Sequence, residues 1–189
     1  MLLKPLVFVL FFWFQLTILF AQAPSYDHYT TANGLASSTV FNMMQDSKGF
    51  VWFATLNGAC KFGGSQFTTY RTVDGLHSNS IISIAEGNNG RIYFGNFEKG
   101  VNILEKGKIH NYYQEMLGKQ FQINTLLFSA AGKNPQLYAF TKPWSLFIIR
   151  EDSGSMISSV KVNVNNLDLI KLVKLPSEEI LVLTSRGIA

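Results

Sequence analysis

The sequence is poor in cysteine and in charged residues, and each shortage excludes a class of protein. Cys60 is the single cysteine among 189 residues, so no disulfide can form within the chain, and no Cys/His spacing typical of zinc accompanies it. Charged residues make up 15%, the formal net charge is +4, and no run of Lys and Arg marks a nucleic-acid-binding surface. We therefore expect no nucleic-acid partner, no metal and no cofactor, and a buried thiol at Cys60 that behaves as a small hydrophobic group.

Long segments with helical periodicity are also missing. Gly, Asn and β-branched residues interrupt the chain every five to eight residues, which excludes a helical solenoid. The content of 47% hydrophobic and 14% aromatic residues is nevertheless high enough to build a core. Short apolar segments separated by Gly turns predict an all-β protein.

Residues 1–23 have the pattern of a secretory signal peptide. Lys4 precedes the apolar run PLVFVLFFWFQLTILF, and the small residues of AQA follow it. Cleavage after Ala23 competes with cleavage after Ala21, and no cysteine stands directly after either site to carry a lipid. We expect an exported, periplasmic chain. The alternative is a retained leader that anchors the chain, because the apolar run approaches the ~18 residues of a membrane span.

Two short sequence motifs each occur twice, and the two copies of each motif are separated by the same number of residues. NGL at positions 33–35 returns as DGL at 74–76, and GFVWF at 49–53 returns at the same separation as GRIYF at 90–94. QLYAFTKPWSLFII and EILVLTSRGIA, near the C-terminus, are weaker copies. The unit therefore recurs about four times.

Within one unit the pattern predicts strands at residues 40–44, 50–55, 59–62 and 67–70. Four short strands in about 40–45 residues, separated by Gly turns, are typical of a propeller blade. Consecutive apolar residues in the strands indicate sheets buried on both faces between neighbouring blades. The predicted fold is an incomplete ring of about four four-stranded antiparallel β-propeller blades. Its predicted units are approximately 31–70, 71–112, 113–155 and 156–189, with 24–30 as the outer strand of a closing blade.

The repeated pattern of NGL, a Gly turn and an aromatic strand resembles the two-component regulator propeller repeat over residues 30–112, and more weakly beyond. That family forms the periplasmic sensor regions of bacterial hybrid histidine kinases and related regulators. The resemblance implies a ring of seven blades, further C-terminal domains in longer members, and kinase activity that belongs to those members or to a signalling partner. We expect this chain to be an N-terminal part of such a ring.

The resemblance further implies an extracytoplasmic sensor of a glycan or another small ligand. The loops at 31–38 and 72–79 and the turns at 56–58, 96–100 and 141–144 should share one face of the blades, where propeller ligands usually bind. An alternative for the Asn-Gly and Asp-Gly pairs is turn chemistry, because these pairs tolerate positive φ. The candidate ligand-binding residues are Asn33, Ser37, Asn57, His77, Asn79, Asn96, Lys142 and Trp144.

Two features leave alternatives open. Trp144 replaces the glycine found at this turn in other units, so it is either a stacking platform for a sugar, with Lys142 beside it, or a plug between blades. His77 lies near Asp74 and Ser78, but no nucleophile elbow or carboxylate pair accompanies it. We assign no catalytic residue and keep a protein-binding scaffold and, with less support, a carbohydrate-active enzyme as alternatives. His28 and His110 are expected on the surface.

Overall fold

The computed structural model is built almost entirely of β-strands. It describes residues 26–98, 100–112, 122–129, 135–142, 145–150, 156–161, 169–175, 180–184 and 187–188. Besides strands, turns and irregular segments, these ranges contain only three-residue 3-10 helices, so the all-β prediction is confirmed. No helix within them is long and apolar enough to span a membrane. The predicted leader lies outside the described residues.

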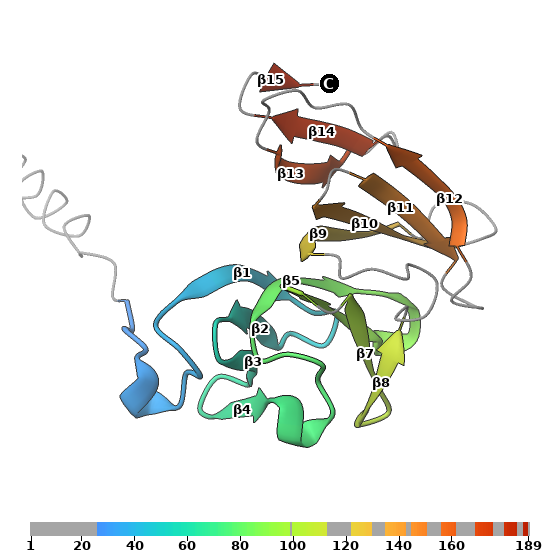
Figure 1. The fold of residues 1–189 in the computed structure, drawn as a ribbon. Coiled ribbons are helices and arrows are strands. Elements are labelled where there is room, and N and C mark those ends of the chain that lie inside the picture. Colours follow the sequence, from blue (N-terminus) through green and yellow to red (C-terminus); the bar gives the residue numbers. More distant parts are fainter. Residues whose placement is uncertain are drawn as a thin grey trace, which may run out of the picture.

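The strands form successive antiparallel sheets in chain order (Figure 1). The first sheet contains β1 (Val40–Gln45), β2 (Val51–Thr55), β3 (Gly58–Phe62) and β4 (Phe67–Tyr70). The second contains β5 (Ile81–Glu86), β6 (Ile92–Asn96), β7 (Val101–Glu105) and β8 (Lys108–Tyr112). The third contains β9 (Gln122–Ser129), β10 (Gln136–Lys142), β11 (Ser145–Arg150) and β12 (Met156–Lys161). The fourth contains β13 (Leu169–Lys174), β14 (Ile180–Thr184) and β15 (Gly187–Ile188).

The outer strand of the third sheet lies beyond residue 155, the approximate end predicted for the third unit. β12 pairs with β11, so it is the outer strand of the third sheet, and the third unit continues past residue 155, where the repeat length placed its end. The strands explain the shift, because β9 and β10 have 8 and 7 residues where β5 and β6 have 6 and 5. The other predicted unit boundaries remain predictions.

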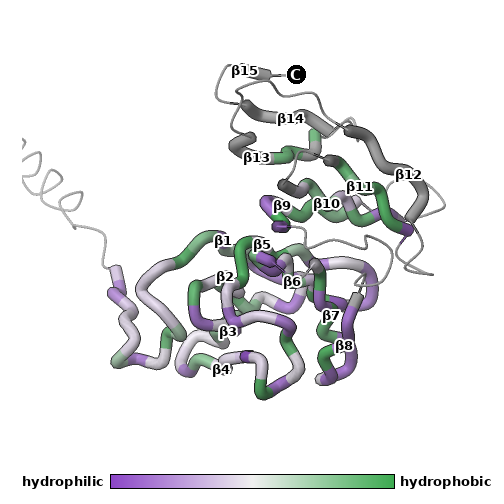
Figure 2. The backbone as a smooth tube through the Cα atoms, in the orientation of Figure 1, coloured by the Kyte–Doolittle hydropathy of each residue, from purple (hydrophilic) through white to green (hydrophobic). Residues whose placement is uncertain are grey.

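The sheets pack face to face along an open arc (Figure 1), with a separate core between each pair. Trp52, Ile84 and Phe94 belong to the core between the first two sheets. Tyr93 and Leu137 belong to the next core, between the second and third sheets. Hydropathy drawn along the backbone follows this arrangement, with apolar stretches in the strands (Figure 2). In β6 all five residues are buried, as expected for a sheet covered on both faces.

The buried carboxylate of Asp46, in an otherwise exposed turn, fixes the position of Trp52. Asp46 follows β1, and its carboxylate accepts hydrogen bonds from the backbone N–H groups of Lys48 and Phe50, at 3.0 and 2.9 Å. The other carboxylate oxygen accepts the Trp52 indole N–H at 2.8 Å. The ring then stacks on Tyr70, with centroids 5.7 Å apart. The QDSKGFVW segment thus holds its own turn and orients a core side chain.

The segment before the first sheet packs on that sheet without pairing. Residues 26–30 form no strand with any described residue, so the outer strand predicted at 24–30 remains a prediction. Tyr29 nevertheless packs its ring against Phe62 and Phe67, with centroids 4.8 and 5.7 Å apart. The face of the first sheet that Tyr29 touches is turned away from the second sheet.

Candidate functional site

The loops that precede β1 and β5 have the same built-in cap. Asn33 Oδ1 accepts the backbone N–H of Thr30 at 2.9 Å, and Asp74 Oδ2 accepts that of Arg71 at 2.8 Å. Gly34 and Gly75, which follow these two acceptors, have left-handed backbone conformations with φ of 105° and 109°. The repeated NGL and DGL phrases are therefore caps of short 3-10 turns.

A second hydrogen bond fastens each loop to the third strand of its own sheet. The Ala36 N–H donates to Cys60 Sγ at 3.1 Å, and the His77 N–H donates to Asn102 Oδ1 at 3.0 Å. Cys60 is fully buried, as predicted, and also serves as a hydrogen-bond acceptor. Asn102 receives a further N–H from Asn96 at 2.9 Å. Each loop is thus hydrogen-bonded to its own sheet.

The turns between the second and third strands meet these loops along one edge. The Leu56 N–H donates to the Thr39 carbonyl at 3.1 Å within the first repeat. Across the boundary between the first two sheets, the Gly58 N–H donates to the Asn79 carbonyl at 2.6 Å. Arg71 Nε adds a bond of 3.2 Å to the carbonyl of Asn57. The loops and turns of two adjacent blades therefore form one continuous surface.

Most of the predicted site side chains on this surface are occupied by structural hydrogen bonds. Besides Asn33, Ser37 Oγ accepts the Thr39 N–H at 3.1 Å, and Asn79 Oδ1 accepts the Thr72 N–H at 2.9 Å. Asn96 was predicted in an exposed turn, and the structure corrects this. It is the last residue of β6, a strand whose sheet is covered on both faces, and it is fully buried, with its amide nitrogen donating to the Gly100 carbonyl and to Asn102 Oδ1.

Asn57 differs from that group. The Asn57 side chain is exposed in the turn, and His77 is half-buried in its loop. Apolar neighbours that the sequence analysis missed lie on the same edge: Leu56 is 52% exposed and Phe97 is 38% exposed. They occupy equivalent positions one repeat apart, and this repetition was the signal that could have identified them. The predicted Trp144 and the side chain of Lys142 lie outside the described residues.

The neighbours of His77 have other bonding partners. The Asp74 carboxylate accepts the Arg71 N–H, and Ser78 Oγ accepts the Ser80 N–H at 3.1 Å. His28 and His110 are exposed, as expected. Within the described ranges, no three His, Cys, Asp or Glu side chains gather closely enough to hold a metal ion.

Comparison with known families decides what the repeat is. Residues 34–57 and 75–98 each match the family model described as "Two component regulator propeller". These segments are two-component regulator propeller repeats. Each match begins at the glycine that follows the capping side chain and runs through β2 or β6 of its sheet. The resemblance inferred from the repeated phrases is confirmed for the regulator propeller repeats of the first two sheets.

Solved structures share the fold of these regulator propeller repeats over most of the chain. The extracellular domain of BT4673 from B. thetaiotaomicron, described as a one-component system and elsewhere as a hybrid two-component system, is 20% identical with a TM-score of 0.63. The match covers 88% of this chain and 22% of that one. The extracellular domain of the BT3049 hybrid two-component system of the same organism is 19% identical, with a TM-score of 0.50 and coverage of 86% and 30%.

A third similar structure is PorZ, a surface component of the type-IX secretion system of Porphyromonas gingivalis. It is 17% identical with a TM-score of 0.64, and the match covers 86% of this chain and 24% of PorZ. The chain thus spans less than a third of the length of each of these structures. At these identities the likeness establishes the propeller fold. The comparison with curated proteins found no match.

Proposed function

We propose that the chain is an extracytoplasmic ligand-sensing propeller module of a two-component signalling protein. The observation that carries this proposal is the pair of regulator propeller repeats at residues 34–57 and 75–98. The predicted leader at residues 1–23 supports export to the periplasm, and the similar BT4673 and BT3049 structures are extracellular domains of signalling systems. The same proposal includes output domains in a longer protein, or a separate signalling partner, to which the module would pass its signal.

The edge formed by the loops and turns is the proposed ligand surface. Asn57 offers an amide that can both donate and accept, and His77 lies in the adjoining loop. Exposed Leu56 and Phe97 add apolar surface beside these polar groups. A sugar ring presents hydroxyl groups at its rim and C–H groups on its faces, so this combination favours a glycan. Lys142 and Trp144 stay in the proposal as contacts from the third unit.

A glycan array probed with the fluorescently labelled chain tests this proposal. Asn57→Ala should weaken binding of a retained oligosaccharide by about tenfold, the loss expected for one hydrogen bond to a ligand. Asn33→Ala is the matched control, because its side chain bonds Thr30 instead of facing a ligand. This control should lower stability and leave affinity unchanged. Equal affinities in both variants would indicate that the ligand binds to another surface. Release of shortened oligosaccharides would favour the enzyme alternative.

A protein-binding scaffold is the second candidate, favoured by the exposure of Leu56 and Phe97 at repeated positions. An array without any bound oligosaccharide would favour it. Under this alternative, Phe97→Ser should abolish the capture of a periplasmic protein, and Asn57→Ala should have little effect.

A further inference from the structure

A half-buried arginine lies beside Asn57 on the edge formed by the loops and turns. Arg71 follows β4, and its guanidinium donates through Nε to the Asn57 carbonyl at 3.2 Å. Its aliphatic stem lies over Gly58, where an added Cβ would be 3.1 Å from Arg71 Cγ. Both contacts hold the side chain against the turn, so the fold itself positions the two terminal Nη groups.

These Nη groups have no partner among the described residues. Arg71 makes one hydrogen bond through Nε and one through its backbone N–H, which donates to the Asp74 carboxylate at 2.8 Å. Asp74 thus lies beside the main chain of Arg71, but it forms no ion pair with the guanidinium. In the described ranges, Arg91 and Glu105 are the pair that neutralise each other. The guanidinium of Arg71 therefore keeps its charge and most of its N–H donors for a ligand.

Oxygen atoms around this arginine already accept hydrogen bonds. The Asn57 carbonyl accepts from Arg71 Nε, and the Asn79 carbonyl accepts the Gly58 N–H at 2.6 Å. Asn79 Oδ1 accepts the Thr72 N–H at 2.9 Å, so the other amide atom, Nδ2, is left as a donor. Donors are thus in excess at this place. A ligand that brings acceptor oxygens and a negative charge fits it.

The neighbouring repeat shows that the loop does not need this arginine in order to fold. Thr30 occupies the equivalent position before the first sheet, and its N–H donates to Asn33 as that of Arg71 donates to Asp74. Both loops form the same short 3-10 turn. The side chain of Arg71 is therefore an addition to the shared loop framework, and a role in recognition accounts for it.

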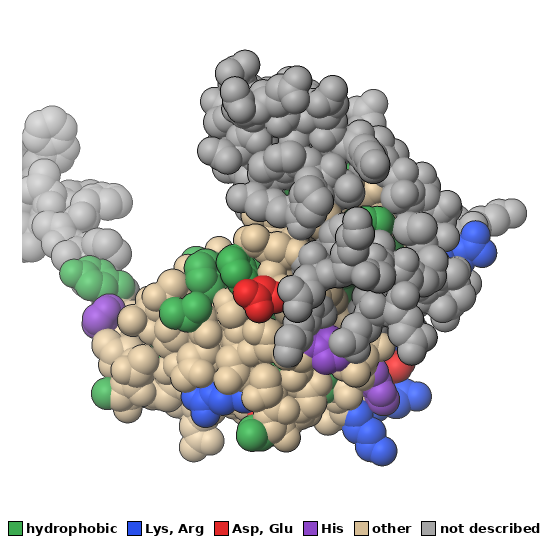
Figure 3. Space-filling view, viewed as in Figure 1, with side chains coloured by type: hydrophobic (Ala, Val, Ile, Leu, Met, Phe, Trp, Pro, Cys, Tyr) green, Lys and Arg blue, Asp and Glu red, His purple; other side chains and the backbone are tan. Residues whose placement is uncertain are grey.

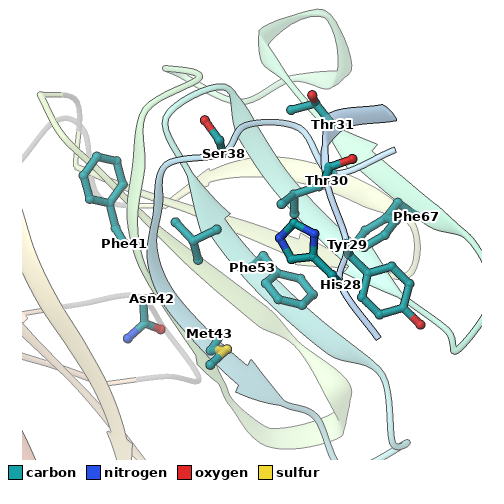
Figure 4. A pocket seen from close by; sticks show the side chains of 12 residues that line it. His28, Tyr29, Thr30, Thr31, Ser38, Phe41, Asn42, Met43, Phe53 and Phe67 are labelled. Carbon is teal, nitrogen blue, oxygen red and sulfur yellow. The ribbon is translucent and has the colours of Figure 1, made fainter. Parts of the chain in front are cut away.

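The positive charge at this place is local. On the side of the molecule shown in Figure 3, the described Lys and Arg side chains lie in separate small groups instead of one continuous basic surface. A pocket of about 960 Å³ on the first sheet has a different character (Figure 4). Met43, Phe53 and Phe67 line it, and none of its described lining residues is Lys or Arg. An isolated oxyanion thus finds its match at Arg71 and not in this pocket.

Apolar surface adjoins the arginine on the same edge. Leu56 precedes Asn57 in the turn and is 52% exposed. The Phe97 N–H donates to the carbonyl of Ser80 at 3.0 Å, which brings Phe97 next to the residue that follows Asn79. A sugar ring packed on this apolar surface would place a charged substituent near the donors of Arg71 and Asn79.

We propose that Arg71 and Asn79 form an anion-binding subsite of the ligand surface, and that the ligand is an acidic glycan whose carboxylate or sulfate group lies against the Arg71 Nη groups. This inference rests on the proposed sensing function and names the chemical class of its ligand. The planar guanidinium offers parallel N–H donors to an oxyanion, and such charge-assisted bonds are roughly twice as strong as neutral ones. An ammonium group is a point charge and lacks this fork.

Titration of the whole ¹⁵N-labelled chain with glucuronate or with sulfate, followed by NMR, tests the subsite without a glycan. Chloride at equal ionic strength is the reference, because screening acts on all exposed charges. We expect glucuronate and sulfate to shift the Asn79 side-chain amide signals. Arg71→Thr, which installs the residue of the preceding repeat, should abolish these shifts, and Arg71→Lys should retain only part of them.

Lys108→Thr is the charge-matched control. It removes one positive charge from an exposed position beside the turn between β7 and β8, at the opposite end of the second sheet from the loop edge. The anion-induced shifts should persist in this variant. Absent shifts in the unmodified chain, or equal shifts in the chain with Arg71→Thr, would overturn the subsite.

A glycan array then identifies the anion and separates this inference from the sensing proposal. We expect the retained glycans to be acidic, and their affinity to fall by about ten- to hundredfold with Arg71→Thr, the loss of a charge-assisted hydrogen bond. The same loss on methyl esterification would identify a carboxylate, and on desulfation a sulfate. Neutral glycans bound as tightly as acidic ones would overturn the acidic ligand and leave the sensing function intact. Anion-induced shifts without any retained glycan would support the subsite and contradict glycan sensing.

Discussion

Replacing Trp52 by alanine should remove a large part of the stability of the first two sheets. The side chain is 2% exposed and packs between Tyr70 and Phe94, and truncating a buried aromatic residue costs about 3–5 kcal/mol. Its indole N–H is also a donor to Asp46, so the variant leaves a carboxylate oxygen of a buried residue without that partner, at a further cost of about 1–3 kcal/mol. We expect a loss of about 4–8 kcal/mol in the free energy of unfolding, comparable with the whole stability of a marginal domain.

Urea unfolding followed by far-UV circular dichroism measures this loss. Trp52→Phe separates its two parts approximately, because it keeps an aromatic ring in the core while it removes the N–H donor to Asp46 and the volume by which indole exceeds phenyl. The phenylalanine variant should therefore lose about 1–3 kcal/mol and retain most of the packing. A loss below about 1 kcal/mol for Trp52→Ala would refute the assignment of this side chain to the core between the sheets.

Two further predictions concern a turn and an ion pair. Gly58→Ala should destabilise the chain by about 2 kcal/mol or more, because Gly58 has φ of 120° and an added Cβ would lie 2.5 Å from the Tyr70 carbonyl oxygen. Gly64→Ala, with φ of 94° and open space around it, should cost only about 1 kcal/mol in the same urea assay, and equal losses would argue against the clash. The hydrogen bond from Arg91 holds the pKa of the Glu105 carboxyl below its ordinary value. A lowered folded-state pKa adds stability above the unfolded-state pKa, and this stability is lost as pH falls through the folded-state value. Glu105→Gln should thus flatten the decline of the urea midpoint below about pH 5, and an unchanged decline would assign it to other groups.

The sequence was sufficient to predict the strands of a blade, but it did not predict correctly which side chains are buried at every strand end. The shared separation of NGL from DGL and of GFVWF from GRIYF located four strands in each of the first two units, because turn glycines and apolar segments recur together. It failed at the end of β6, where Asn96 was expected in the turn. A shift of one position at a strand end decides whether a side chain is buried. The repeat spacing was the missed signal, because it pairs Asn96 with Thr55, which lies inside the predicted strand at 50–55.

The candidate surface shows the same limit. The sequence placed the loops and turns on one edge, and the bonds from Leu56 to Thr39 and from Gly58 to Asn79 unite them. It did not separate Asn33, which caps its own turn, from Asn57, whose side chain is exposed. Both precede a glycine, so only the hydrogen bonds of the folded chain distinguish their roles.

The two loop anchors show how such repeats can diverge while the fold is preserved. One loop N–H is received by the sulfur of Cys60 and the other by the amide oxygen of Asn102, at nearly equal donor–acceptor distances. What each repeat retains is therefore an acceptor at a fixed place, and chemically unrelated residues can supply it. Residue identity can therefore differ between repeats while the hydrogen-bond geometry stays the same. The family matches stop at residue 98, whereas the antiparallel sheets continue to β15.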